Sequence, residues 1–135
     1  MYTKPYDMSI HYLSMLGWLS ARDCYLPHHS EIPKIGFVAY EGKDMVAMGF
    51  IRRVEGNYGQ LDGLVSNPDM PPKLRSQAID LVTQKIIEKA KSLKIKTLVA
   101  FTKDKNTLVR SFSHGFGQLP DTMIGIDLRQ GTGAS

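Results

Sequence analysis

The stretch from Gly59 to Ser92, GQLDGLVSNPDMPPKLRSQAIDLVTQKIIEKAKS, decides the fold. It begins with a short apolar run, breaks at Asn67-Pro68 and again at Pro71-Pro72, and continues as the longest helical pattern of the chain. The first turn of a helix carries unpaired N–H groups and the positive end of the helix dipole, so a strand that turns into a helix often binds an anion there. Lys73 and Arg75 lie in that first turn. The pattern therefore indicates a candidate phosphate-binding turn.

Composition indicates an ordinary globular chain of 135 residues, 42% hydrophobic and 22% charged, which is long enough to bury a core. No apolar run approaches the roughly 20 residues that span a bilayer, and the N-terminus lacks the layout of a signal peptide. The single cysteine, Cys24, excludes an internal disulfide and a Cys-based zinc site, and we expect it to be small and buried. We therefore expect a cytoplasmic protein with no membrane partner. The net charge of +4 and the pI near 9.2 suit an anionic partner, either a phosphorylated cofactor or nucleic acid.

Hydrophobic periodicity predicts elements before that stretch. Residues 1–6 form a short strand, and a helix N-capped by Asp7 follows, with Trp18 in the core. Residues 22–35 read as an irregular loop with two prolines. Three strand-like runs, 36–40, 45–51 and 60–66, then predict an antiparallel meander. The inner face of the first helix is predicted to carry Ile10, Leu13, Leu16/Gly17 and Leu19.

The second half of the chain predicts a helix, a parallel strand and a shorter helix. The helix over Pro71–Ser92 has an apolar stripe, and residues 96–102 read as a strand buried on both sides, which gives a right-handed crossover. A helix over Thr107–Ser113 and a last strand over Thr122–Leu128 follow. We therefore expect an α/β (α+β) fold in which a mixed β-sheet is flanked by helices and a β-meander is followed by βαβαβ. One domain would cover residues 1–128, and residues 129–135 would be a flexible C-terminal tail. The predicted stripe consists of Ala78, Val82, Ile86, Ala90 and Leu93.

This order resembles the GNAT superfamily of acyl-CoA N-acyltransferases over about residues 36–128. In that family a Pro-acidic pair, here Pro68-Asp69, ends the fourth strand, and a Gln/Arg-x-x-Gly-x-Gly/Ala turn binds the cofactor pyrophosphate. Lys73–Ala78 (KLRSQA) is the best match, with Ser76 and Ala78 at the glycine positions. Asn106 and Gly115-Phe116 match an Asn after the fifth strand and a Gly-Phe that closes the next helix. The proline-bearing loop is similar to that of GNAT-like proteins of phage genomes, which would place the protein in the host cytoplasm.

The resemblance implies acetyl-CoA as co-substrate. Its pantetheine arm would pair with the main chain near Leu64, Val65 and Ser66, and Asn106 would also contact it. At the helix turn, Leu74 and Ser76 bring side chains where family members bring glycines, although the Ser76 hydroxyl can itself donate. The pyrophosphate would rest on Lys73, Leu74, Arg75, Ser76, Gln77 and Ala78.

Three residues are candidates for proton transfer. Asp62 lies in the fourth strand, where the family often keeps a carboxylate base, although a solvent-facing strand carboxylate is the alternative. His114 has a suitable ordinary pKa, but its place before Gly115 also suits a helix C-terminal cap. Ser113 is a candidate general acid, because the family's frequent tyrosine has no counterpart here. The neighbouring histidines His28-His29 lack metal-ligand spacing, so we expect no metal site.

The resemblance implies an N-acetyltransferase that moves an acetyl group from acetyl-CoA to an amine of a small molecule or protein by direct attack. A catalytically degenerate GNAT-fold protein, with a binding or virion-associated role, is the second interpretation, because the glycines and the tyrosine are missing. Nucleic-acid binding is the third, and no interleaved aromatic residues accompany the lysines that would carry it. Whether the chain forms a homodimer stays open. Those lysines are Lys85, Lys89, Lys91, Lys94 and Lys96.

Overall fold

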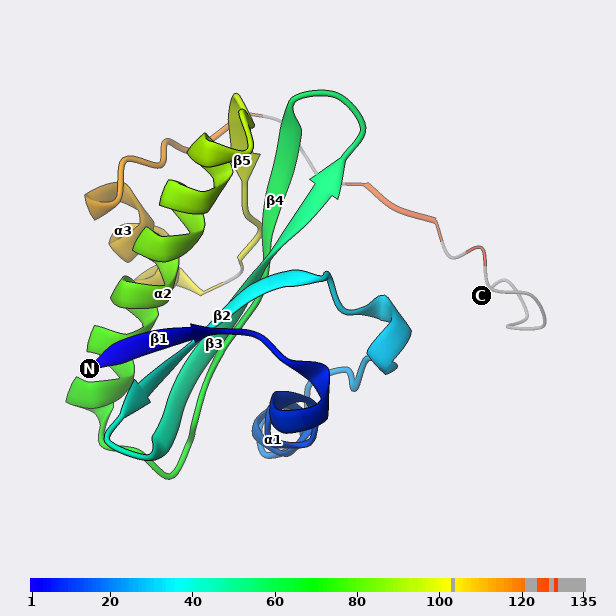
Figure 1. The fold of residues 1–135 in the computed structure, drawn as a ribbon. Coiled ribbons are helices and arrows are strands. Elements are labelled where there is room, and N and C mark those ends of the chain that lie inside the picture. Colours follow the sequence, from blue (N-terminus) through cyan, green and yellow to red (C-terminus); the bar gives the residue numbers. More distant parts are fainter. Residues whose placement is uncertain (103, 121–123, 127, 129–135) are drawn as a thin grey trace. The chain divides into compact units, whose positions relative to one another are not determined.

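The computed structural model describes residues 1–102, 104–120, 124–126 and 128. They belong to two compact units, Met1–Lys103 and Asp104–Ser135. The first unit contains a five-stranded sheet, helices α1 and α2, and the short 3-10 helix η1, His29–Glu31 (Figure 1). The second contains helix α3, Lys105–Ser113.

The strands lie in the sheet in their chain order. Neighbouring strands from β1 to β4 are antiparallel, and β5 pairs in parallel with β4. The predicted first strand and meander are therefore confirmed, and so is the parallel pairing of the strand that follows the long helix. The strands are β1 (Tyr2–Pro5), β2 (Ile35–Glu41), β3 (Asp44–Val54), β4 (Tyr58–Ser66) and β5 (Thr97–Val99).

Helix α2 (Pro72–Ser92) covers one face of the sheet (Figure 1). Its predicted stripe is confirmed, since Ala78, Val82 and Ile86 are each 0% exposed. The helix approaches β3 closely at Gly49, where an added Cβ would lie 3.1 Å from both the Val82 Cγ1 and Ile86 Cδ1 atoms. A side chain at this strand position would push the helix away from the sheet.

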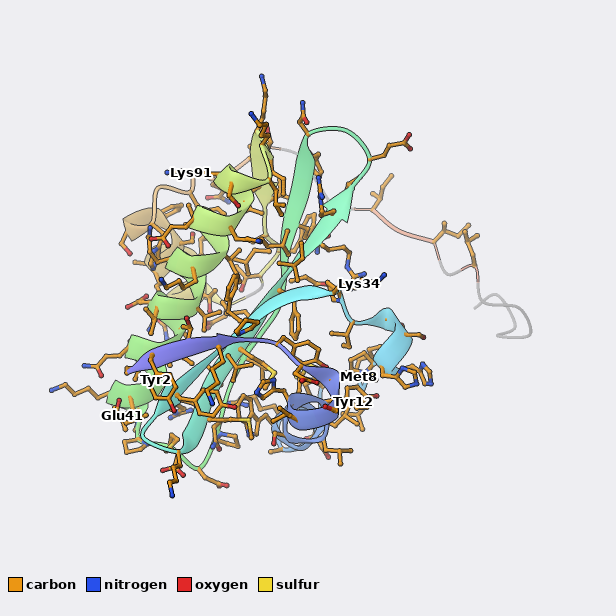
Figure 2. The ribbon with its side chains drawn as sticks, in the orientation of Figure 1. Tyr2, Met8, Tyr12, Lys34, Glu41 and Lys91 are labelled. Carbon is orange, nitrogen blue, oxygen red and sulfur yellow. The ribbon has the colours of Figure 1, made fainter. Side chains whose placement is uncertain are left out.

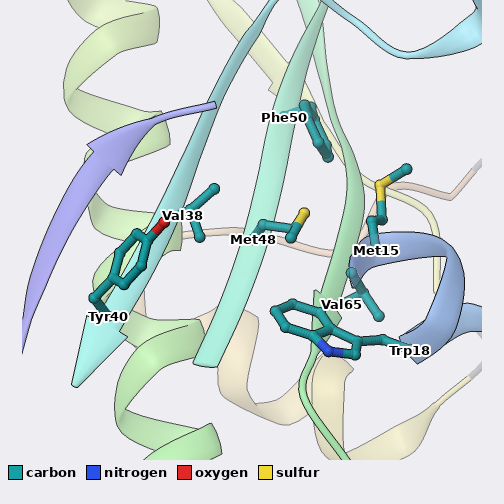
Figure 3. Close-up of a cluster of buried hydrophobic side chains, with 7 residues drawn as sticks. All are labelled: Met15, Trp18, Val38, Tyr40, Met48, Phe50 and Val65. Carbon is teal, nitrogen blue, oxygen red and sulfur yellow. The ribbon is translucent and has the colours of Figure 1, made fainter. Parts of the chain in front are cut away.

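Helix α1 (Met8–Ser20) covers the other face, where Met15 and Trp18 pack against side chains of β2, β3 and β4 (Figure 3). The Asp7 cap is confirmed, because its Oδ1 accepts from the Ser9 N–H at 2.9 Å. The predicted inner face is wrong: Ile10 and Leu13 are 60% and 79% exposed. The buried residues of the helix are His11, Met15 and Trp18.

His11 is the reason for that error, because a histidine counts as polar in a hydrophobic pattern. Its Nδ1 accepts from the Asp7 N–H at 2.9 Å, so its Nε2 carries the proton and donates to the Tyr40 hydroxyl at 2.7 Å. With both ring nitrogens paired, the imidazole is buried at little cost, and burial lowers its pKa.

Other differences fall at the ends of elements. Strand β5 is only three residues long and half-exposed, because among the described residues it pairs with β4 alone; Phe101 beyond it is 56% exposed. Cys24 is exposed instead of buried, since it follows the turn at Asp23 that ends α1. The predicted last strand falls partly outside the described residues, and its described residues 124–126 and 128 form no strand. The predicted tail, 129–135, lies outside them, and the single domain over 1–128 stays a prediction.

Helix α3 begins at Lys105, two residues earlier than predicted. Asp104 is its N-cap, and its Oδ2 accepts from the Thr107 N–H at 2.9 Å. Gly115 has a φ of +93°, which confirms it as the left-handed residue that follows the helix. None of the helices within the described residues has the length and apolar character needed to cross a bilayer.

Candidate functional site

Strand β4 contains one extra residue in its middle. Asp62 lies opposite Phe50 and Val65 lies opposite Met48, so Gly63 and Leu64 together face a single residue of β3. Gly63 takes a φ of +63°, which glycine adopts without strain. Such a bulge bends a strand and redirects its backbone groups. It divides β4 into a half that ends at Asp62 and a half that runs to Ser66.

One edge of β4 is open beyond its first three residues. The pairing with β5 stops at Gln60, and no strand of the described residues pairs with 61–66 on that side. The Asn67 N–H donates to the Val46 carbonyl of β3 at 2.7 Å, so the Ser66 carbonyl, on the other side of that peptide, points to the open edge. By alternation Leu64 also turns its backbone groups to this edge, and Val65 turns its own toward β3.

The three residues predicted to meet a cofactor arm therefore differ in how accessible their backbone groups are to a ligand. Leu64 directs its main chain to the open edge. Val65 is 6% exposed and belongs to the core under α1. The Ser66 carbonyl already accepts from Arg22 Nη1 at 2.7 Å, and its hydroxyl oxygen accepts from Nη2 at 3.1 Å. The structure thus leaves the backbone of Leu64 as the principal main-chain group for a ligand along β4.

A tight turn joins this edge to helix α2. The Asn67 side chain builds it: its Oδ1 accepts from the Asp69 N–H at 3.0 Å, and its Nδ2 donates to the Met45 carbonyl at 2.9 Å. Pro72 is the first residue of the helix, one residue after the predicted start at Pro71, and Pro71 at the cap position offers no side-chain hydrogen bond. The helix N-terminus consequently lies directly after the open strand edge.

The first turn of α2 is basic and lacks a cap. It holds Lys73 and Arg75 and contains no acidic residue. The Arg75 Nε is buried and has no hydrogen-bond partner among the described residues, which is costly for a cationic N–H group. An anion at this turn would satisfy both the guanidinium and the helix dipole. The turn therefore fits a phosphate group.

The other residues predicted for the phosphate turn are placed less uniformly. Leu74 and Ser76 are half-buried, and Gln77 is exposed. Ala78 is 0% exposed in the stripe that packs on the sheet, so its side chain faces away from any ligand in solvent. Ala78, which the resemblance aligned with the second glycine position of the motif, serves helix packing with its small side chain.

A cavity of about 270 Å³ lies on the α1 side of the sheet, between α1, the 22–35 loop and strands β3 and β4. It reaches β4 at Asp62 and Gly63, where the bulge begins. Its polar lining includes Tyr25, Glu31 and Arg52. Its apolar lining consists of Met15, Leu19, Pro27, Ile32, Pro33 and Phe50.

An ion pair closes the β-sheet end of this cavity. The Asp62 Oδ2 accepts from Arg52 Nε and lies 2.8 Å from Arg52 Nη2, and its Oδ1 accepts from the Gly63 N–H at 2.9 Å. Arg52 Nη2 also donates to the Glu31 carbonyl at 2.8 Å. Asp62 is thus a fixed, partnered carboxylate, and its side chain is 31% exposed, so the solvent-facing alternative is not contradicted. The glycine next to Asp62 in the strand is a sequence signal that could have indicated the bulge. No sequence signal indicates that Asp62 pairs with Arg52.

The 22–35 loop is tied down by its own polar groups. Tyr12 of α1 (Figure 2) donates from its hydroxyl to the Pro27 carbonyl at 2.6 Å. The Tyr25 hydroxyl and the His28 N–H both donate to Glu31 Oε1 at 2.8 Å. His28 also caps helix η1 through its ring. Among the described residues, no group of three His, Cys, Asp or Glu side chains is arranged to hold a metal.

The remaining predicted residues belong to the second unit. Asn106 lies in the first turn of α3. The Ser113 hydroxyl donates to the Arg110 carbonyl at 2.6 Å, and His114 occupies the C-terminal cap position that the sequence suggested. The first unit brings together Asp62, the β4 edge and the α2 turn.

Solved structures share the fold of this chain. A GNAT family acetyltransferase of Streptococcus pneumoniae matches with a TM-score of 0.72 over 95% of this chain and 98% of that chain, at 14% identity. The chain has the GNAT fold. A Mycobacterium tuberculosis protein in complex with CoA shares the GNAT fold with a TM-score of 0.72 over 93% of this chain and 76% of that chain, at 13% identity.

An aminoglycoside 6'-N-acetyltransferase of Acinetobacter haemolyticus matches with a TM-score of 0.62 over 94% of this chain and 98% of that chain, at 16% identity. No family model and no curated protein matches the sequence. The predicted mixed α+β architecture and the resemblance to GNAT proteins are therefore confirmed as a divergent GNAT fold. The similarity to phage proteins stays a prediction.

Proposed function

We propose that the protein is an acyl-CoA-dependent N-acyltransferase, which moves an acetyl group from acetyl-CoA to an amine by direct attack. The observation that carries the proposal is the open edge of β4 at the Gly63 bulge. This edge leads to an uncapped basic helix turn, and a cavity reaches the same bulge. One place can thus receive an extended phosphorylated ligand and a second, smaller molecule.

The cofactor side uses main-chain groups and cations. An extended arm with amide groups pairs with an open strand edge as an added strand would, and Leu64 offers the backbone groups for it. Lys73 and Arg75 bind the phosphates at the first turn of α2, where the Arg75 Nε gains the partner that it lacks within the described residues. When bound, acetyl-CoA supplies the activated acetyl thioester.

The acceptor side uses the cavity. Its walls hold the amine next to the bulge, and this positioning contributes a large part of the rate. A backbone N–H at the bulge polarises the acetyl carbonyl. Asp62, held in place by Arg52, accepts the amine proton directly or through a water molecule. Ser113 and His114 of the second unit stay proposed proton carriers, and Asn106 a proposed cofactor contact.

Isothermal titration with acetyl-CoA tests the cofactor site. Lys73→Glu and Arg75→Glu should each weaken binding by about tenfold or more, because a hydrogen bond to a charged group contributes about 1.5–3 kcal/mol. Lys91→Glu is the matched control: the same charge change at the other end of α2 (Figure 2) should leave the affinity within about twofold. Equal binding by all four proteins would overturn the site.

A degenerate binding protein is the second candidate, and two observations favour it. The Ser66 carbonyl is occupied by Arg22, and Ser76 places a side chain where a phosphate would approach a glycine backbone. A protein of this kind would bind CoA and release none from acetyl-CoA with any amine. Thiol release, followed with a chromogenic reagent in the presence of an amine mixture, separates the two functions.

A further inference from the structure

Arg22 lies at the open edge of β4, although it belongs to the chain that follows α1. Its Nη1 donates to the Ser66 carbonyl at 2.7 Å, and that carbonyl points to the edge along which the cofactor is proposed to bind. Resting on the proposed function, we infer that Arg22 is a further cofactor-binding residue, whose guanidinium leaves the Ser66 carbonyl for a phosphate oxygen when the cofactor binds.

The turn that ends α1 fixes the backbone of Arg22. The Cys24 N–H donates to the Leu19 carbonyl at 3.0 Å, and the Asp23 N–H donates to the Ser20 carbonyl at 3.1 Å. Asp23 has a φ of +54°, so these two bonds form the usual left-handed ending of a helix. Because the backbone is held in this way, the side chain of Arg22 starts from a defined place, and only its rotamer has to change on binding.

The side chain of Arg22 crosses the edge toward the face that α2 covers. Val65 packs in the core under α1. Leu64 lies on the opposite face, because an added Cβ at Gly49 would lie 2.9 Å from its Cδ1 and 3.1 Å from side chains of α2. By alternation the Ser66 side chain also lies on the α2 face, and its hydroxyl oxygen accepts from Arg22 Nη2 at 3.1 Å. The guanidinium therefore reaches the side of the sheet on which α2 lies.

The path of the proposed cofactor passes this guanidinium. Along the chain, Ser66 lies between Leu64, which offers its backbone to the arm, and the first turn of α2 with Lys73 and Arg75. A ligand that pairs with Leu64 and carries its phosphates to that turn runs past Ser66 and meets Arg22. A further cation is then available to the phosphates beside the two of the helix turn.

The partners of Arg22 in the free protein are weak competitors for a guanidinium. They are the Ser66 carbonyl, the Ser66 hydroxyl and the Trp18 carbonyl, which accepts at 3.2 Å, and all three are neutral. Within the described residues Arg22 forms no ion pair, and it is exposed. A phosphate adds the attraction of opposite charges, and a planar guanidinium binds it through two parallel hydrogen bonds. The exchange therefore favours phosphate, and it frees the Ser66 carbonyl for an amide N–H of the arm.

The test compares the affinities for CoA and for pantetheine, which has the same arm and no phosphate. Arg22→Gln removes the charge and should weaken CoA binding in isothermal titration by about tenfold or more, the size of one hydrogen bond to a charged group. Pantetheine binding, followed by the NMR shift of the Leu64 amide, should stay within about twofold or become tighter, because pantetheine offers no charge to Arg22.

Two results would overturn the inference. An equal loss of affinity for CoA and pantetheine in Arg22→Gln would show that Arg22 only holds α1 against β4. Tighter binding of both ligands would show that Arg22 only blocks the edge.

Two further variants make the comparison specific. Arg22→Lys keeps the charge and should lose less CoA affinity than Arg22→Gln does. Arg53→Gln is the matched control, because Arg53 is also exposed and lies opposite Gly59, about 20 Å along the strand from Ser66. It should leave both affinities within about twofold, since so distant a charge is screened by salt. Equal losses in Arg22→Gln and Arg53→Gln would assign the effect to net charge and contradict the inference.

A crystal structure of the wild type with CoA tests the exchange without any variant. The guanidinium of Arg22 should lie about 3 Å from a phosphate oxygen and away from the Ser66 carbonyl. A guanidinium that stays on Ser66 in the complex would refute the exchange.

The outcomes separate this inference from the proposed function. CoA binding that depends on Lys73 and Arg75 but not on Arg22 would overturn the inference alone. CoA binding that depends on Arg22, without thiol release from acetyl-CoA with any amine, would uphold the inference and overturn the acyl transfer. A wild-type protein that binds no CoA would overturn both.

Discussion

The ring of Phe50 is enclosed by two glycines on neighbouring strands, and this packing makes Gly63→Ala an informative substitution. A Cβ at Gly63 would lie 2.9 Å from Phe50 Cδ2, and one at Gly36 would lie 2.4 Å from Phe50 Cδ1. Phe50 is 1% exposed in the core under α1, so the ring has no free space to enter. An alanine at position 63 therefore meets both an unfavourable backbone angle and a steric contact.

The two costs can be separated. A left-handed φ costs an alanine about 1–2 kcal/mol, and overpacking a core side chain costs about 1–3 kcal/mol, so Gly63→Ala should lower the free energy of unfolding by about 2–5 kcal/mol. Gly42→Ala is the matched control, because its φ of +60° is nearly the +63° of Gly63 and nothing lies within 4 Å of its Cβ. Gly42→Ala should therefore show only the first cost.

Urea unfolding measures the difference, which should be about 1–3 kcal/mol at an unchanged m value. Acetyl-CoA titration of the same proteins adds a functional measurement: a displaced bulge should weaken binding in Gly63→Ala and leave it unchanged in Gly42→Ala. Equal losses of stability in the two variants would refute the packing argument. Full cofactor affinity in a folded Gly63→Ala protein would refute the role of the bulge.

Three further predictions concern α1 and the proton carriers. Met15→Ala should lower the free energy of unfolding by about 2–5 kcal/mol and Leu13→Ala by less than about 0.5 kcal/mol, and equal losses in urea unfolding would contradict the orientation of the helix. Burial lowers the pKa of His11 below its ordinary value of 6.5, so as the pH falls the unfolded chain takes up a proton before the folded chain does. The contribution of the neutral His11 to the free energy of unfolding is therefore full above pH 6.5 and is lost as the pH falls below it. His11→Gln should remove this part of the pH dependence of the thermal midpoint, and a slope equal to that of the wild type below pH 6.5 would contradict it. Under the proposed function, Asp62→Asn should lower kcat and flatten the acidic limb of the pH–rate profile, while a profile unchanged in both Asp62→Asn and His114→Ala excludes both as proton carriers.

Strong local patterns allowed most of the first unit to be predicted. The stripe of α2 repeats every four residues and is buried as expected, and the meander follows from alternating runs separated by glycine-containing turns. The face of α1 was not predictable from hydropathy, because His11 is buried only through its contacts with Asp7 and Tyr40. The contact with Tyr40 lies 29 residues away in sequence, so no local pattern reports it.

The candidate site, too, was predictable only where it depends on local sequence. The basic first turn of α2 is a local feature and was predicted from Lys73 and Arg75. The network around Asp62 depends on the register of β3 against β4 and on the path of the 22–35 loop, which brings the Glu31 carbonyl to Arg52. Neither the register nor the loop path can be predicted from local sequence patterns.

The proposed chemistry explains why the fold persists at 13–14% identity to structures that match it with a TM-score of 0.72. An open strand edge, a bulge and a helix N-terminus bind through backbone N–H and C=O groups, which every residue except proline carries in full. At such a site the choice of residue is constrained mainly by the local backbone conformation, as at Gly63, where a φ of +63° favours glycine. Ser76 can therefore replace a glycine of the family motif provided that an anion still reaches the backbone of the α2 turn. The titration of Lys73→Glu and Arg75→Glu against Lys91→Glu decides whether it does.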